Sequence, residues 1–242
     1  RQSKKNGDPN PGRYYPPQEY EKYGKARIVS IAYCIFSREN RHVHTVYHIV
    51  RPNGFVIDDN SQATAVHGIT QKKARQKGVQ WSTIFNEMNE FMPYIGRIVA
   101  HNIGFDKNML CAELYRHGTP TATQLAEKIQ KCPGYCTLAK ARQLNNLPGG
   151  FHTDGTKLEC KLERLYAHYY PGETFKAHDA LEDVQACQRC YRKLFPYNAV
   201  DWDTTSLETA VEGTPSPKTS PIVKAGEASQ RLMTEFVAVA TS

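Results

Sequence analysis

The sequence predicts an α/β fold, and three observations support that prediction. Residues 27–36, 43–50 and 97–100 are short segments rich in β-branched and aromatic residues, which favour strands. Elsewhere, apolar residues recur at three- and four-residue spacing, as they do in amphipathic helices. The chain has 242 residues, enough for one core in which helices pack against a sheet.

The N-terminal half begins with a proline-rich segment and continues into a hairpin. Residues 1–25 carry four prolines among Gly, Asn and Tyr, which predicts an extended surface loop. A polar connection separates residues 27–36 from residues 43–50, as expected for two antiparallel strands. Residues 55–57 form a candidate third strand. From Trp81 to the next proline, apolar side chains follow helical spacing and predict an amphipathic helix.

The second half alternates predicted strands and helices and ends in a polar tail. Beyond Tyr197 the composition shifts to Thr, Ser, Pro, Ala and Glu without sustained periodicity, so residues 199–242 are expected to be a disordered tail. The folded domain is then expected over residues 26–198, after the loop of residues 1–25. Its predicted elements are strands at 97–100 and 135–138, and helices at 105–116, 157–170 and 180–194.

Charge and cysteine content narrow the function classes. The chain carries a net charge of +7, and because residues 199–242 hold six acidic and three basic residues, residues 1–198 carry +10. Such an excess favours an anionic partner. No apolar run approaches the roughly 18 to 20 residues that span a bilayer, so a membrane protein is excluded. Seven scattered cysteines indicate reduced thiols and a soluble intracellular protein, cytoplasmic or nucleoid/nuclear.

Two segments place a carboxylate in the first turn of a helix. Asp106 follows a buried strand and a polar turn, and Asp183 lies five residues after His178 on the packed face of the last helix. A carboxylate on a packed face is costly unless something pairs with it. Hard oxygen ligands of this kind suit Mg²⁺ or Mn²⁺. Two such ions can promote phosphodiester hydrolysis while a histidine such as His178 takes the proton of the attacking water.

The sequence here resembles a known family. The segments AHNIGFDKNML and HDALEDVQAC resemble the second and third motifs of the DEDDh (DnaQ-like) 3′–5′ exonucleases, and residues 65–70 resemble the family's HGIT element. The resemblance covers about residues 26–195 and implies an RNase H-like mixed sheet flanked by helices. It implies His178 as general base and Asp106 and Asp183 as ligands of two Mg²⁺ or Mn²⁺ ions. The residues that it implies beside the terminal nucleotide are His67, His101, Asn102 and Phe105.

The family's first motif, an Asp-x-Glu pair on the central first strand, is absent from its expected position before residue 26. Two explanations remain open: the motif lies just upstream of Arg1, or the protein is a non-catalytic relative that binds nucleic acid or acts as a scaffold. Loss of the motif would also remove the central strand and leave two strand edges unpaired, which favours the first explanation. The printed chain is then expected to lack its first central strand and to be weakly active or inactive. The pairs Glu19/Glu21 and Asp201/Asp203 have the right spacing but lie in the predicted loop and tail.

The resulting functional hypothesis is a metal-dependent exonuclease that releases nucleoside monophosphates from nucleic-acid 3′ ends. DNA is favoured over RNA as the substrate, and the family's proofreading members suggest a polymerase or replication complex as a partner. One feature stays open, because a basic cluster after the HGIT element fits phosphate contacts and a solvated face equally well. It consists of Lys72, Lys73, Arg75 and Lys77.

Overall fold

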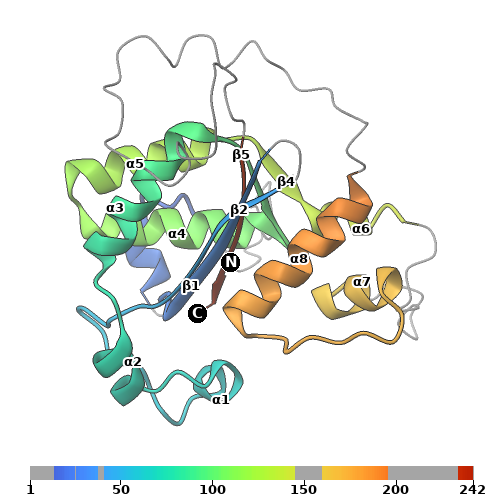
Figure 1. Cartoon of the computed structure of the whole chain (residues 1–242). Coiled ribbons are helices and arrows are strands. Elements are labelled where there is room, and N and C mark those ends of the chain that lie inside the picture. Colours follow the sequence, from blue (N-terminus) through green and yellow to red (C-terminus); the bar gives the residue numbers. More distant parts are fainter. Residues whose placement is uncertain (1–13, 25, 38–40, 145–159, 196–233, 242) are drawn as a thin grey trace, which may run out of the picture.

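The protein folds around one mixed five-stranded sheet (Figure 1). The computed structural model describes residues 14–24, 26–37, 41–144, 160–195 and, as backbone only, 234–241. The strand order is β2-β1-β5-β3-β4, with β5 antiparallel to β1 and parallel to β3. The strands are β1 (Ser30–Ser37), β2 (His42–Ile49), β3 (Ile95–Ala100), β4 (Gly134–Cys136) and β5 (Thr234–Thr241).

Helices cover both faces of the sheet. In Figure 1, α3, α4 and α5 lie on one side of the strands and α6, α7 and α8 on the other, while α1 and α2 lie beyond the sheet. The α-helices are α1 (Gln62–His67), α2 (Gln71–Lys77), α3 (Trp81–Phe91), α4 (Ile103–His117), α5 (Pro120–Lys131), α6 (Thr137–Ala141), α7 (Leu162–Tyr169) and α8 (Ala180–Leu194). Two 3₁₀ turns, η1 (Tyr20–Tyr23) and η2 (Met92–Tyr94), complete the described elements.

Strand β1 divides the core into two layers. All eight of its residues are buried, and successive side chains enter opposite hydrophobic clusters. Ile31, Tyr33 and Ile35 join the cluster formed with α3, α4 and α5. Ala32 and Cys34 join the cluster formed with α7 and α8. A strand covered on both faces has no polar face, which explains its continuous apolar sequence.

The centre of the sheet is filled by β5, which corrects two sequence-based expectations. Residues 199–242 were expected to be a disordered tail, which is wrong for residues 234–241, while residues 199–233 and 242 lie outside the described residues. The central strand was expected to be missing. Instead, β5 pairs with β1 from Ser30↔Thr241 to Ser37↔Thr234 and with β3 from Ile95↔Thr234 to Val99↔Val237. The physical reason is that β1 and β3 would otherwise expose unpaired backbone groups inside a covered sheet. Composition missed this strand because the apolar run 236–240 is short and follows a long polar segment.

The described part of the proline-rich segment is packed rather than only extended. Tyr23 of η1 is buried in the core, and its hydroxyl donates to the carbonyl of Tyr15. Next to it, the buried Glu113 carboxylate on α4 accepts from Arg27 Nε at 2.8 Å and pairs with Arg116 Nη1 at 2.8 Å. These contacts attach the entrance of β1 to α4. Residues 1–13 of the predicted loop lie outside the described residues.

Several other boundaries differ from the sequence-based expectations. The predicted third strand at 55–57 has no strand conformation, and the predicted strand at 135–138 becomes β4 followed directly by α6. Helix α7 begins at Leu162, and residues 157–159 of the predicted helix lie outside the described residues. Helix α5 was not predicted from the sequence, although Thr119 caps it and Pro120 occupies its first turn.

The structure also describes the cysteines and the apolarity of the helices. All seven cysteines lie in described segments and none forms a disulfide; six are buried and Cys136 is half-buried. Among the helices of the described ranges, none combines the length and apolarity needed to cross a bilayer.

A proline at the middle of β5 tests its central position. Val237 pairs with Cys34 on one side and with Val99 on the other. Val237→Pro removes the backbone N–H, whereas Val237→Ala retains it. We expect the proline variant to lose at least about 2 kcal/mol more unfolding free energy than the alanine variant in denaturant titrations. Equal stability of the two variants would contradict the central pairing of β5.

Candidate functional site

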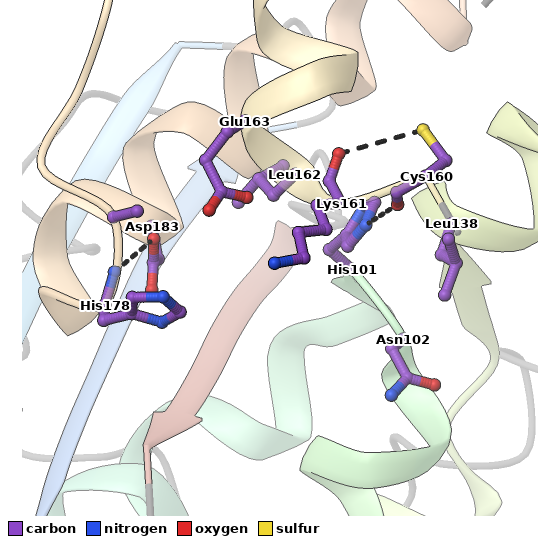
Figure 2. Close-up of a pocket in the computed structure, with 10 residues that line it drawn as sticks. His101, Asn102, Leu138, Cys160, Lys161, Leu162, Glu163, His178 and Asp183 are labelled. Carbon is purple, nitrogen blue, oxygen red and sulfur yellow. Dashed lines mark hydrogen bonds between the residues drawn. The ribbon is translucent and has the colours of Figure 1, made fainter. Parts of the chain in front are cut away.

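A pocket of about 300 Å³ opens between α7, the start of α8 and the β3–α4 turn (Figure 2). It is wide enough for a small polar ligand group and lies beside both motif segments identified in the sequence. Four of the seven predicted site residues line it. The lining residues are His101, Asn102, Leu138, Cys160, Lys161, Leu162, Glu163, Ala177, His178 and Asp183.

On one side of the pocket, His178 and Asp183 are joined through the backbone. His178 adopts a left-handed conformation with φ of 68°, and its N–H donates to Asp183 Oδ1 at 3.3 Å. Asp179 then caps α8 by accepting from the N–H groups of Leu181 and Glu182. The turn therefore places the His178 imidazole beside the Asp183 carboxylate at the pocket wall, as Figure 2 shows.

The Asp183 carboxylate is costly to ionise. Its pKa is raised from 3.8 to about 6, chiefly by burial; the N–H and the charge of His178 oppose this rise, and the charges of Glu163 and Asp179 add to it. A desolvated carboxylate that faces a second carboxylate is stabilised by a bound cation. This is the property that a metal ligand at this position requires.

On the other side of the pocket, both ring nitrogens of His101 are held by the protein. Nδ1 lies 3.0 Å from Thr137 Oγ1, and Nε2 lies 2.8 Å from the carbonyl oxygen of Cys160. His101 therefore ties α6 and the segment before α7 to the end of β3. Asn102 has a left-handed backbone with φ of 72°, and its Nδ2 donates to the Tyr14 hydroxyl at 3.3 Å.

Asp106 is buried in the first turn of α4 and does not line the pocket. The pKa of Cys187 is raised chiefly by burial, and the charge of Asp106 adds to that rise. Cys187 lies one helical turn after Asp183 on α8. The two predicted metal-ligating carboxylates thus belong to helices that approach one another at the same end of the sheet.

The carboxyl end of β5 lies between these two helix starts. Tyr47 and Val239 both pair with Ala32, so they share one row across the sheet. Burial raises the pKa of Tyr47, and the charge of Asp179 raises it further, which locates the start of α8 over this row. Helix α4 starts just after β3, the other neighbour of β5. The last described residues of β5, Ala240 and Thr241, carry no carboxylate.

The described residues do not complete a metal centre. Within these ranges, no group of three or more His, Cys, Asp or Glu side chains is arranged to hold a metal ion. Asp106 and Asp183 supply hard oxygen ligands, but two carboxylates do not fit a two-ion site. The remaining ligands of such a site would come from outside the described residues.

The other predicted substrate neighbours lie away from the pocket lining. His67 ends α1 and its Nδ1 accepts from the N–H of Ile69 at 3.0 Å; burial, and then the charge of Lys73, lowers its pKa. The Phe105 ring packs against Tyr14, with centroids 6.2 Å apart. None of the four residues of the basic cluster on α2 lines the pocket.

Two charged residues of the pocket wall, Lys161 and Glu163, were not predicted from the sequence. Both residues fell inside the single helix that was predicted over residues 157–170, where nothing marked them as site residues. Lys161 is in fact the N-cap residue of α7, and Glu163 lies in its first turn. No motif in the sequence pointed to these two residues, because only tertiary packing brings α7 opposite the β3–α4 turn.

The raised pKa of Asp183 predicts a stability change with pH in the absence of divalent cations. Because the folded state holds the proton more tightly than the unfolded chain, this contribution to stability is present below about pH 4 and is lost as pH rises through about 6. Asp183→Asn keeps an acceptor for the His178 N–H and abolishes the titration. We expect it to be more stable than wild type by about 1 kcal/mol at pH 7, a value reduced for partial exposure.

Thermal or urea unfolding between about pH 4 and 8 measures this difference. Glu182→Gln is the matched control, since it removes the same charge one residue away. A wild-type profile that runs parallel to that of Asp183→Asn would show that Asp183 ionises without cost.

The left-handed backbone of His178 predicts a second stability effect. Residues with a Cβ pay about 1 kcal/mol for this conformation, and glycine does not. His178→Gly and His178→Ala both remove the imidazole, so their difference isolates the backbone. We expect the glycine variant to be about 1 kcal/mol more stable by denaturant unfolding. An alanine variant of equal stability would argue against a positive φ at residue 178.

Comparisons with known proteins agree on fold and family. A sequence model of the exonuclease family, RNase_T, matches residues 18–191. The crystal structure of E. coli Exonuclease I in complex with a dA16 oligonucleotide is similar at a TM-score of 0.50 and 18% identity, over 68% of this chain and 38% of that one. Exonuclease I in complex with a 5cy-dT13 oligonucleotide gives a TM-score of 0.49 and 16% identity, over 71% and 43%. The chain thus spans less than half of these structures, and no curated protein matches it.

Proposed function

Because this chain belongs to the exonuclease family RNase_T, we propose that it is the substrate-binding and proton-accepting part of a metal-dependent 3′–5′ exonuclease. Its fold is RNase H-like, with the helices and mixed sheet expected of that family. The proposed substrate is a nucleic-acid 3′ end, with DNA preferred. The observation that carries the proposal is the convergence of His178, Asp183, His101 and Asn102 on one pocket.

The proposed reaction is hydrolysis of the terminal phosphodiester bond. The His178 imidazole takes a proton from water as the water oxygen bonds to phosphorus, and the bond from phosphorus to the 3′ oxygen breaks. The leaving oxygen is protonated by solvent, which releases a nucleoside monophosphate. Exonucleases of this kind generally use divalent metal ions, and Asp106 and Asp183 are the proposed ligands within this chain.

The net charge of the chain and its similar structures support the choice of substrate. Residues 1–198 carry +10, which favours a polyanionic partner. The similar E. coli Exonuclease I structures contain oligodeoxynucleotides, which supports DNA over RNA. Single-stranded DNA is therefore the first substrate to test.

A second candidate function is favoured by β5. The expected loss of the central strand was the reason for favouring an upstream motif over a non-catalytic relative, and that reason no longer holds because residues 234–241 fill the position. The last two residues of this strand are Ala240 and Thr241, and the sequence of the strand contains no Asp-x-Glu pair. The second candidate is therefore a module of the same fold that binds nucleic acid without cleaving it.

Installing the absent carboxylates separates the two candidates. Ala240→Asp together with Ser242→Glu restores a one-residue gap, which directs two side chains to the same side of a strand. We expect residues 1–242 to shorten a 5′-labelled single-stranded oligonucleotide little or not at all with Mg²⁺ or Mn²⁺. The double variant should shorten it from the 3′ end by at least about tenfold more, because it supplies the carboxylates that a two-ion site lacks.

The matched control is the double variant with Asp183→Asn, which should return to background. Digestion that survives Asp183→Asn would contradict its assignment as a ligand. Robust metal-dependent digestion by the unaltered chain would contradict two statements: that its metal site is incomplete, and that it binds nucleic acid without cleaving it. A double variant that folds, binds the oligonucleotide and leaves it intact would favour the binding module.

A further inference from the structure

Among the described residues that line the pocket, Lys161 is the one lysine or arginine. It occupies the N-cap position of α7, where its carbonyl accepts from the N–H groups of Arg164 and Leu165 at 3.1 and 3.2 Å. The adjacent Cys160 carbonyl is held by His101 Nε2 at 2.8 Å. The backbone at residues 160 and 161 is therefore held by the first turn of α7 and by His101.

The side chain of Lys161, by contrast, is exposed and makes no hydrogen bond or ion pair with any described residue. Figure 2 shows its amine pointing into the space between His101 and the His178–Asp183 pair. Glu163 is two positions along the chain, a spacing at which helical side chains do not face one another. Its charge acts on Asp183 instead. A side chain with a fixed backbone and an ammonium group that no described residue pairs with is suited to binding a ligand.

The chemistry of the pocket defines that ligand. Asp183 and Glu163 place two carboxylates on the wall, so an anion could not approach it without a compensating cation. Lysine is a compact positive charge that contacts phosphate oxygens without requiring a planar partner. A backbone phosphate seated between Lys161 and His178 would lie where the proposed function needs the reacting bond.

We propose that Lys161 forms a phosphate subsite that holds the backbone of a nucleic-acid strand at its 3′ end. The inference rests on the proposed function for the identity of the strand, but it concerns binding and is independent of cleavage. Lys161 thereby positions the phosphate opposite His178. Its contribution to binding affinity does not require a completed metal centre.

Fluorescence anisotropy with a 5′-fluorescein-labelled oligothymidylate, in EDTA, tests the subsite without a contribution from cleavage. We expect Lys161→Met to bind about three- to tenfold more weakly than wild type and to reduce the slope of log affinity against log salt by about 0.7, as for one lost single-strand phosphate contact. Lys161→Arg should retain most of the affinity and the slope.

The matched control is Lys131→Met, which removes the same charge from an exposed position at the end of α5, on the opposite face of the sheet. Equal affinity and equal slope for Lys161→Met and Lys131→Met, with unfolding midpoints like wild type, would overturn the subsite. Binding that depends on Lys161 in a protein whose carboxylate-restored variant never cleaves would uphold the subsite and overturn the exonuclease. Absence of oligonucleotide binding by wild type would overturn both.

Discussion

The double hydrogen-bond ladder of β5 is the constraint on which the rest of the structure depends. β1 and β3 lie on either side of it, and the side chains of each strand alternate between the two helical layers. Without a strand between them, two rows of backbone donors and acceptors would be buried unpaired, at a cost that a domain of marginal stability cannot sustain. The centre of this fold must therefore be occupied, and here the last described segment of the chain occupies it.

The same constraint organises the functional site. Because α4 starts beyond the end of β3 and the start of α8 lies over the Ala32–Val239 row, both motif helices present their first turns near the carboxyl end of β5. A central strand can thus complete the sheet while leaving the chemistry incomplete. Backbone pairing requires only N–H and C=O groups, whereas metal binding requires particular side chains. This separation allows one fold to serve cleavage or binding alone.

Elements with strong periodicity were predictable, and elements whose form depends on neighbours were not. Trp81, Ile84 and Met88 identify α3 because large apolar side chains recur on one face. Helix α5 was missed because alanines fill part of its buried face, alongside Leu125 and Ile129. At the site, His178 and Asp183 were found together because they share one turn. Lys161 was not found, because its place opposite them arises from packing between distant segments.

The sequence by itself determined which chemistry the chain carries: an imidazole and two first-turn carboxylates in the order of the exonuclease motifs, on a domain of positive charge. The motifs are local and the net charge is a sum over residues, so both can be read from the sequence alone. Only the tertiary structure decided which segment completes the sheet, which side chains share the pocket and how far burial raises the pKa of Asp183. Those properties depend on which strand edges pair and on how much solvent is excluded, and both follow from contacts between residues far apart in the chain.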